Sequence, residues 1–252
     1  MCLDNITTSN FSKIQYLRSH NSNITYPVLK DMFKRGLAEP GVPSEHDELL
    51  DVTALLLIKV HKDNTILPSL VDTIFLRNRE GLFTLDLIWA FFEARDPYSL
   101  MLIANYLESD DSNDVKLARK LLDFVPSIDM SEEKNGKKQY MDFFRFFKEN
   151  SPFLYFTGEN FQRTSKPIRY IVSKTAKYLC RRISLNTGNP LTSLTGNENN
   201  LLANFNRLDD DKQSLLSNFS LRLHYENLSL WNSWIKTSIS NQISTAHTGL
   251  MF

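Results

Sequence analysis

The sequence predicts an all-α protein, built either as an irregular helical bundle or as a short α-solenoid-like array of helical hairpins. Three observations lead to this prediction. Apolar residues recur at helical spacing, residues that typically begin helices precede those stretches, and the links between them are only a few residues long. Short links place consecutive helices antiparallel, which is the arrangement of a helical hairpin.

The chain divides into three parts by pattern. Residues 1–25 are polar and without periodicity, so we expect an N-terminal arm. Residues 26–130 form the predicted helical-hairpin region, and residues 131–252 form a second, more irregular helical region. The second region contains a predicted basic helix over 166–183 and a predicted uncharged C-terminal helix over 226–245.

Helix starts are clearest in the middle of the hairpin region. Asp96 is followed by Pro97, which is a typical N-cap with proline at the first helical position. This pair begins a predicted helix over 97–109 that is apolar nearly all round and should therefore lie between neighbours. Ser112 or Asn113 can cap the next helix.

The predicted basic helix has an apolar side and a positive side. Successive residues placed at 100° intervals put the apolar residues on one arc and the polar ones on the other. The positive side comprises Lys166, Tyr170, Lys174, Lys177 and Arg181. The chain has no acid between Asn160 and Asn197, so these cations have no carboxylate partner at i,i+4 spacing.

Charge is unevenly distributed along the chain even though Lys plus Arg and Asp plus Glu both number 29. Residues 82–133 carry 11 acids and 4 bases, whereas residues 134–187 carry 12 bases and 3 acids. Three interpretations of the basic face follow. It docks on an acidic protein surface, it contacts the phosphates of a nucleic acid, or it is solvated or matched by the chain's own acids.

The predicted C-terminal helix is almost free of charge, since Lys236 is the only charged residue after Glu226. Trp231 and Trp234 are three residues apart and cannot both lie at the centre of one apolar stripe. One of them is therefore a candidate contact for a partner or for a second copy of the chain. The alternative is that this helix is the last helix of the core.

Patterns for metal, cofactor or nucleotide chemistry do not emerge from the sequence, so we expect no metal site and no cofactor. Cys180 lies at the edge of an apolar arc, which favours a buried structural cysteine over a reactive one. An enzyme whose site is assembled only by folding stays open as an alternative.

The function that we expect is that of a non-catalytic helical interaction or scaffold protein. Its partner would be an acidic protein surface or a second copy of itself, bound through the basic helix and the aromatic C-terminal helix. A nucleic-acid-binding regulator that uses the basic helix is the alternative from another class. With two cysteines, no signal-peptide pattern and no long apolar run, we expect a cytoplasmic protein without membrane association.

Overall fold

The computed structural model describes residues 26–38, 44–128, 136–161 and 164–249. Within these residues the chain forms twelve α-helices, several short 3₁₀ helices and one two-stranded antiparallel sheet, so the all-α prediction is confirmed. None of the helices in the described segments is long and apolar enough to cross a membrane. The predicted arm, residues 1–25, lies outside the described residues.

The described chain divides into two compact units. Unit 1 contains residues 1–143 and 158–169, and unit 2 contains residues 144–157 and 170–252. Helix α8, Gly136–Asn150, belongs to unit 1 with its first half and to unit 2 with its second. This helix, which contains four phenylalanines, is therefore shared by both units.

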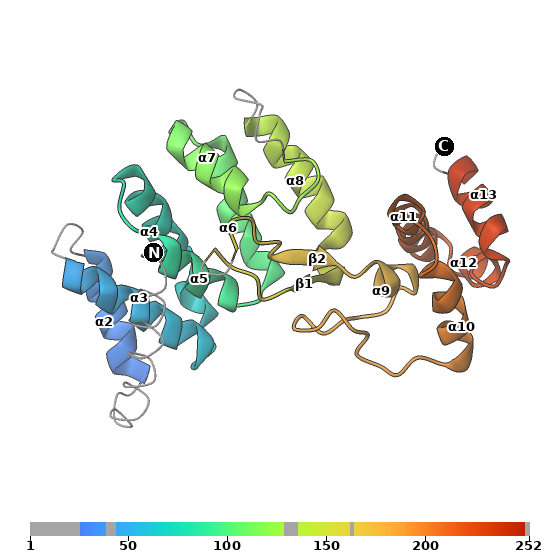
Figure 1. Cartoon of the computed structure of the whole chain (residues 1–252), viewed down its shortest axis with the longest axis horizontal. Helices are drawn as coiled ribbons and strands as arrows, with labels where there is room; N and C mark the ends of the chain where they lie inside the picture. The colour runs from blue at the N-terminus through green and yellow to red at the C-terminus, as the bar shows by residue number, and fades with distance from the viewer. Residues whose placement is uncertain (1–25, 39–43, 129–135, 162–163, 250–252) are drawn as a thin grey trace. The chain divides into compact units, whose positions relative to one another are not determined.

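Unit 1 is a set of helices packed side by side (Figure 1). Its helices ahead of α8 are α2 Tyr26–Ala38, α3 Ser44–Lys59, α4 Leu67–Arg79, α5 Leu85–Glu93, α6 Leu100–Ala104 and α7 Ser112–Leu121. Helix α3 packs against α2 and α5, and α4 packs against α5, α6 and α7. A buried ion pair joins α3 to α4, with Arg77 Nη1 2.7 Å from Asp51 Oδ1.

The prediction of one regular helix over 97–109 is wrong. It consists of a 3₁₀ turn η2, Pro97–Ser99, the short helix α6 and a second 3₁₀ turn η3, Asn105–Glu108. The Asp96 side chain accepts the amide of Tyr98, as a helix cap does. Helix α7 is capped by Asp111, whose carboxylate accepts the amide of Asn113, and not by Ser112 or Asn113 themselves.

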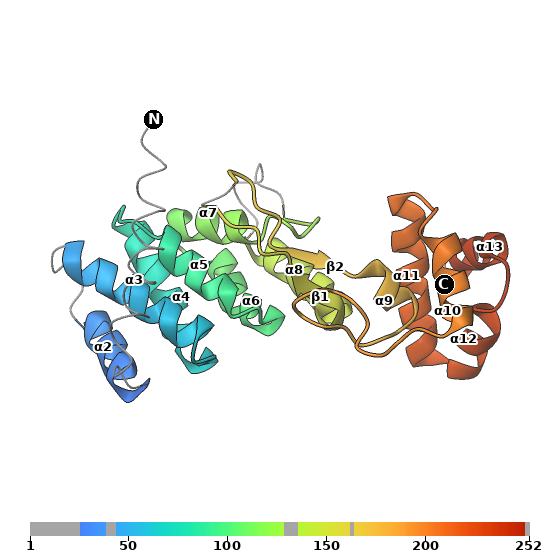
Figure 2. The ribbon, with the colours of Figure 1, turned by 60° about the horizontal axis from the view of Figure 1, so that its bottom comes forward.

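Unit 2 contains the sheet and four longer helices at its end (Figure 2). Strand β1, Leu154–Phe156, pairs antiparallel with β2, Tyr170–Val172. The short helix α9, Lys174–Tyr178, follows the sheet. The four longer helices are α10 Gly196–Phe205, α11 Asp210–Glu226, α12 Leu228–Trp234 and α13 Ile239–Gly249. The core between them includes stacked rings of Tyr178 and Phe205, whose centroids are 4.4 Å apart.

The predicted basic helix over 166–183 is not formed. Residues 170–172 are strand β2, and only residues 174–178 are helical. The β-branched residues Ile171 and Val172 suit a strand as well as a helix, and the pairing with β1 decides between the two. Cys180 ends the helical turn with a φ of 53°, in the left-handed region that stops a right-handed helix.

The predicted helix over 226–245 is divided into α12 and α13. The buried Gln242 side chain of α13 donates to two carbonyl oxygens in the link between the helices, those of Ile235, at 2.9 Å, and Thr237, at 3.0 Å. Its Oε1 accepts from the hydroxyl of Tyr178 at 2.6 Å. The break is therefore stable because the carbonyl groups that it releases are hydrogen-bonded inside the core.

Candidate functional site

Two cations of the basic stretch, Lys174 and Arg181, are paired within unit 2 with acids far away in sequence. Lys174 Nζ contacts Asp210 at the start of α11. Arg181 donates from Nε and Nη2 to Glu198 Oε1, at 2.9 and 2.7 Å. The same Glu198 carboxylate completes the cap of α10, and its pKa is lowered first by the backbone amide of Thr195 and then by Arg181.

Lys177 is buried, with 1% of its surface exposed, and lies inside unit 2. Its Nζ donates to Asn150 Oδ1 at 2.7 Å and to Asn218 Oδ1 at 2.5 Å. Burial lowers the pKa of this amine to about 8, because the two neutral amide oxygens replace only part of the hydration that an ammonium group loses.

The five predicted basic-face residues therefore do not share one exposed face. Tyr170 is buried and its ring lies 5.7 Å from that of Phe156. Lys166 is exposed and belongs to unit 1. The physical reason is that a strand and a short helix turn successive side chains in directions that a continuous helix would not. Their use as a binding surface stays a prediction.

Both candidate interface tryptophans pack on the core of unit 2. Trp234 is buried, and its ring lies 5.1 Å from that of Phe219 in an edge-to-face arrangement. Trp231 is half-buried, and its Nε1 donates to Ser220 Oγ at 2.8 Å. Both residues lie on α12 three positions apart, so they project from the same side of the helix, and both rings contact one core. Their role in partner binding also stays a prediction.

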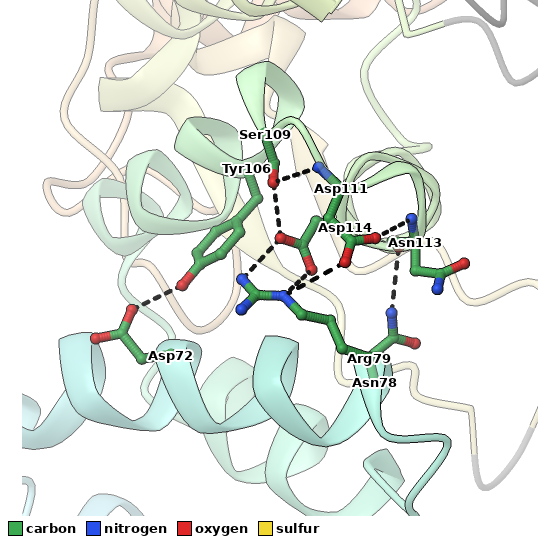
Figure 3. A network of polar contacts seen from close by, with 8 residues as sticks. All are labelled: Asp72, Asn78, Arg79, Tyr106, Ser109, Asp111, Asn113 and Asp114. Atoms are coloured by element: carbon green, nitrogen blue, oxygen red, sulfur yellow. Dashed lines mark hydrogen bonds and ion pairs between the residues drawn. The ribbon is translucent and has the colours of Figure 1, made fainter.

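In unit 1 a polar network joins α4 to η3 and α7 (Figure 3). Arg79 on α4 donates from Nε and Nη2 to the two oxygens of Asp114, at 2.9 and 2.8 Å. Asp114 is fully buried and also accepts from Ser109 Oγ at 2.8 Å. This bidentate contact raises the pKa of Arg79 and fixes the start of α7 against α4.

A second contact of this network fixes η3. Tyr106 donates from its hydroxyl to Asp72 Oδ1 at 2.8 Å, and its ring stacks on Phe75 with centroids 3.6 Å apart. Burial and the Asp72 carboxylate raise the pKa of Tyr106, so the hydroxyl stays a donor. The residues that link η3 to α7 are therefore anchored to α4 at both ends, through Tyr106 on one side and through Asp114 on the other.

Beside this network lies a pocket of about 570 Å³, entirely within unit 1, which we call the α7–α8 pocket. Its walls are η3 with the residues that follow it, α7 and the start of α8. Leu107 and Val115 give it an apolar part. The charged side chains that line it are Glu108, Asp110, Lys116, Arg119 and Lys137.

Arg119 is the unusual member of this lining because it is buried, with 4% of its surface exposed. Its Nε donates to Oε1 of the buried Gln139, on α8, at 2.8 Å. Its Nη2 is buried without a hydrogen-bond partner. A buried donor without an acceptor is uncommon and costs about 1–3 kcal/mol, so this atom calls for an explanation.

The close approach of α8 to η3 shapes the pocket and depends on a glycine. A Cβ atom added to Gly136 would lie 2.1 Å from the carbonyl oxygen of Leu107, much closer than van der Waals contact allows. Both residues line the pocket. Only glycine therefore permits the start of α8 to lie at this position.

The sequence interpretation did not select this pocket. Its signal was present in the segment "KLARK", residues 116–120, which holds three of the four bases of the acidic stretch 82–133. Lys116 and Arg119 are three residues apart, so on a helix they lie on the same side. The bond between Arg119 and Gln139 spans twenty residues and has no local signature.

Metal ligation has no candidate in the described ranges, where no group of three or more His, Cys, Asp or Glu residues is arranged to hold an ion. Known proteins offer no parallel either: no family model, no curated protein and no solved structure matches this chain.

Proposed function

We propose that the chain is a non-catalytic helical interaction protein that binds an acidic segment of a partner protein in the α7–α8 pocket. The observation that carries this proposal is Arg119, a buried guanidinium that lines the pocket and has an Nη2 without an acceptor. A partner's carboxylate or phosphate oxygen is the acceptor that a guanidinium binds most strongly.

The charges around Arg119 support an anionic ligand. Lys116 and Lys137 are exposed side chains of the same lining, one from α7 and one from α8. Exposed cations attract an acidic segment from a distance and orient it, while the buried Arg119 supplies the stronger contact because water screens it less. The volume of about 570 Å³ is large enough for a few side chains of a bound segment.

This proposal keeps the class of partner expected from the sequence, an acidic protein surface, and moves the contact to another part of the chain. Lys174 and Arg181 already pair with acids of unit 2, and Lys177 is buried. A partner would have to compete with these intramolecular contacts. The lysines of the α7–α8 pocket line an open hollow instead.

A titration of a fluorescein-labelled, glutamate-rich peptide tests the proposal. Fluorescence anisotropy is followed at low and moderate salt, with a matched peptide in which every Glu is replaced by Gln. We expect saturable binding of the glutamate peptide only. The variant Lys116→Glu should weaken this binding by about tenfold, since it replaces attraction by repulsion at the pocket.

The variant Lys34→Glu is the matched control, because Lys34 is an exposed residue of α2 that does not line the pocket. It carries the same charge change and should leave the affinity nearly unchanged. Equal losses in the two variants would show that only net charge matters. Absence of binding at low salt, or tighter binding of single-stranded DNA than of the peptide, would contradict the proposal in favour of another partner class.

A further inference from the structure

We infer that the anionic group held in the α7–α8 pocket is a phosphate monoester on a serine or threonine of the partner segment. This inference rests on the proposed function, because it names the group that the partner inserts. The pocket has three cationic side chains from two helices, Lys116, Arg119 and Lys137. A carboxylate offers two oxygens in one plane, whereas a phosphate monoester offers three terminal oxygens and a higher charge.

Arg119 is already held in position to receive such a group. Its Nε bond to Gln139 fixes the plane of the guanidinium, and Gln139 is itself buried with 1% of its surface exposed. A planar donor group fixed before binding loses little conformational entropy when an anion arrives. Arg119 lines the pocket, so an anion bound there lies beside this fixed guanidinium.

The two acids of the lining restrict what accompanies the phosphate. Glu108 and Asp110 are exposed and lie before α7 begins, whereas Arg119 is the eighth residue of that helix. The helical rise separates the two ends of this wall by about 10 Å. An extended peptide covers that length in about three residues. The pocket therefore fits a phosphorylated residue with an arginine or lysine about three positions away.

The same two acids argue for a peptide over other carriers of phosphate. A nucleic acid has phosphates at regular intervals and no cationic group, so Glu108 and Asp110 would repel it. Free inorganic phosphate would contact the cations and leave both acids without a partner. A segment with charges of both signs matches both ends of the lining.

Four labelled peptides of otherwise identical sequence test the inference on the full chain. The first carries phosphoserine flanked by arginines about three positions away on either side, as extended geometry suggests. The second has unmodified serine, the third has glutamate at that position, and the fourth keeps phosphoserine but has glutamates for the arginines. We expect the first peptide to bind at least about tenfold more tightly than each of the others.

Two further measurements, the affinities of pocket variants and the pH dependence of binding, test whether the phosphate binds in this pocket. Lys116→Glu and Arg119→Lys should each weaken binding of the first peptide by about tenfold, while Lys34→Glu should not change it. Affinity for the first peptide should rise between about pH 5.5 and about pH 7.5, because the phosphate takes its second charge near pH 6. Affinity for the glutamate peptide should stay level over this range.

The outcomes separate this inference from the proposed function. If the glutamate peptide binds as tightly as the phosphopeptide and Lys116→Glu weakens both, the phosphate assignment is overturned and the proposed function stands. If none of the four peptides binds at low salt, both are overturned. If a single-stranded oligonucleotide or inorganic phosphate competes more strongly than the phosphopeptide, the peptide assignment is overturned.

Discussion

Lys177 makes the stability of unit 2 depend on pH in a direction that can be worked out. Its ammonium group is buried against two neutral amide oxygens, and burial lowers its pKa from 10.5 to about 8. One pKa unit corresponds to about 1.4 kcal/mol. The charged form therefore costs the folded protein about 3 kcal/mol relative to the unfolded chain, where the amine is solvated.

The sign of the pH dependence follows from which state holds the proton. Below about pH 8 the amine is protonated in both states, and the whole cost is present. Between about pH 8 and pH 10.5 the unfolded chain keeps the proton and the folded protein releases it. The free energy of unfolding therefore rises with pH in this range, by up to about 1.4 kcal/mol per pH unit.

Cys180 and Tyr178 oppose this rise at higher pH. Burial raises the pKa of the Cys180 thiol from 9.0 to about 11 and that of Tyr178 from 10.0 to about 12. From about pH 9 to pH 11 the unfolded thiol is ionised and the folded thiol is not, so stability is lost as pH rises. The wild-type protein should gain about 1 kcal/mol between about pH 8 and pH 9 and then level off.

Urea unfolding at a series of pH values measures this effect. Trp231 and Trp234 lie in unit 2, so a Trp89→Phe background, which removes the tryptophan of unit 1, makes fluorescence report unit 2 alone. Lys177→Met should abolish the rise, and Cys180→Ser should extend it beyond pH 9. A flat or falling stability between pH 8 and pH 9, or an unchanged rise in Lys177→Met, would refute the reasoning.

Three further predictions concern unit 1. Asp114→Asn should lower the free energy of unfolding by about 2 kcal/mol, because the buried Asp114 carboxylate accepts hydrogen bonds from three donors. Asp72→Asn, at an exposed position, should lower it by less than about 1 kcal/mol in the same urea titration. Gly136→Ala should lower both stability and peptide affinity, since the added Cβ would clash with the backbone of η3. Gly196→Ala is the control and should be neutral, because nothing lies within 4 Å of its added Cβ. Equal effects of the two substitutions would contradict the role given to Gly136. Arg169→Met should lower the melting temperature followed by circular dichroism, because the buried guanidinium donates to carbonyl oxygens at the end of α7, and an unchanged temperature would show that these bonds contribute nothing.

Local features of the fold could be predicted from the sequence because they depend on neighbouring residues. Asp96 caps its helix in the expected place, and helical periodicity identifies the all-α class. The basic stretch could not be predicted in the same way. Its apolar spacing fits a helical wheel, but Ile171 and Val172 join a strand whose partner, β1, ends more than ten residues earlier in the chain.

The partners of buried and paired charges lie far away in sequence, and this explains the errors at the candidate site. Lys174 pairs with Asp210 and Arg181 with Glu198, so two cations of the positive side that the helical wheel suggests are already paired in the folded protein. The α7–α8 pocket depends equally on distant pairs. Arg119 is fixed by Gln139, and the start of α8 lies against η3 because of Gly136.

The location of a bound acidic segment tests the central claim most directly. Amide chemical shifts of the isotope-labelled protein, recorded while the phosphoserine peptide is added, identify the residues that it contacts. We expect saturating shifts in α7 and in the first turn of α8, and their loss in Arg119→Lys. Shifts that centre on residues 174–182 or 228–234, with α7 unchanged, would contradict the account and return the contact to the surfaces first expected from the sequence.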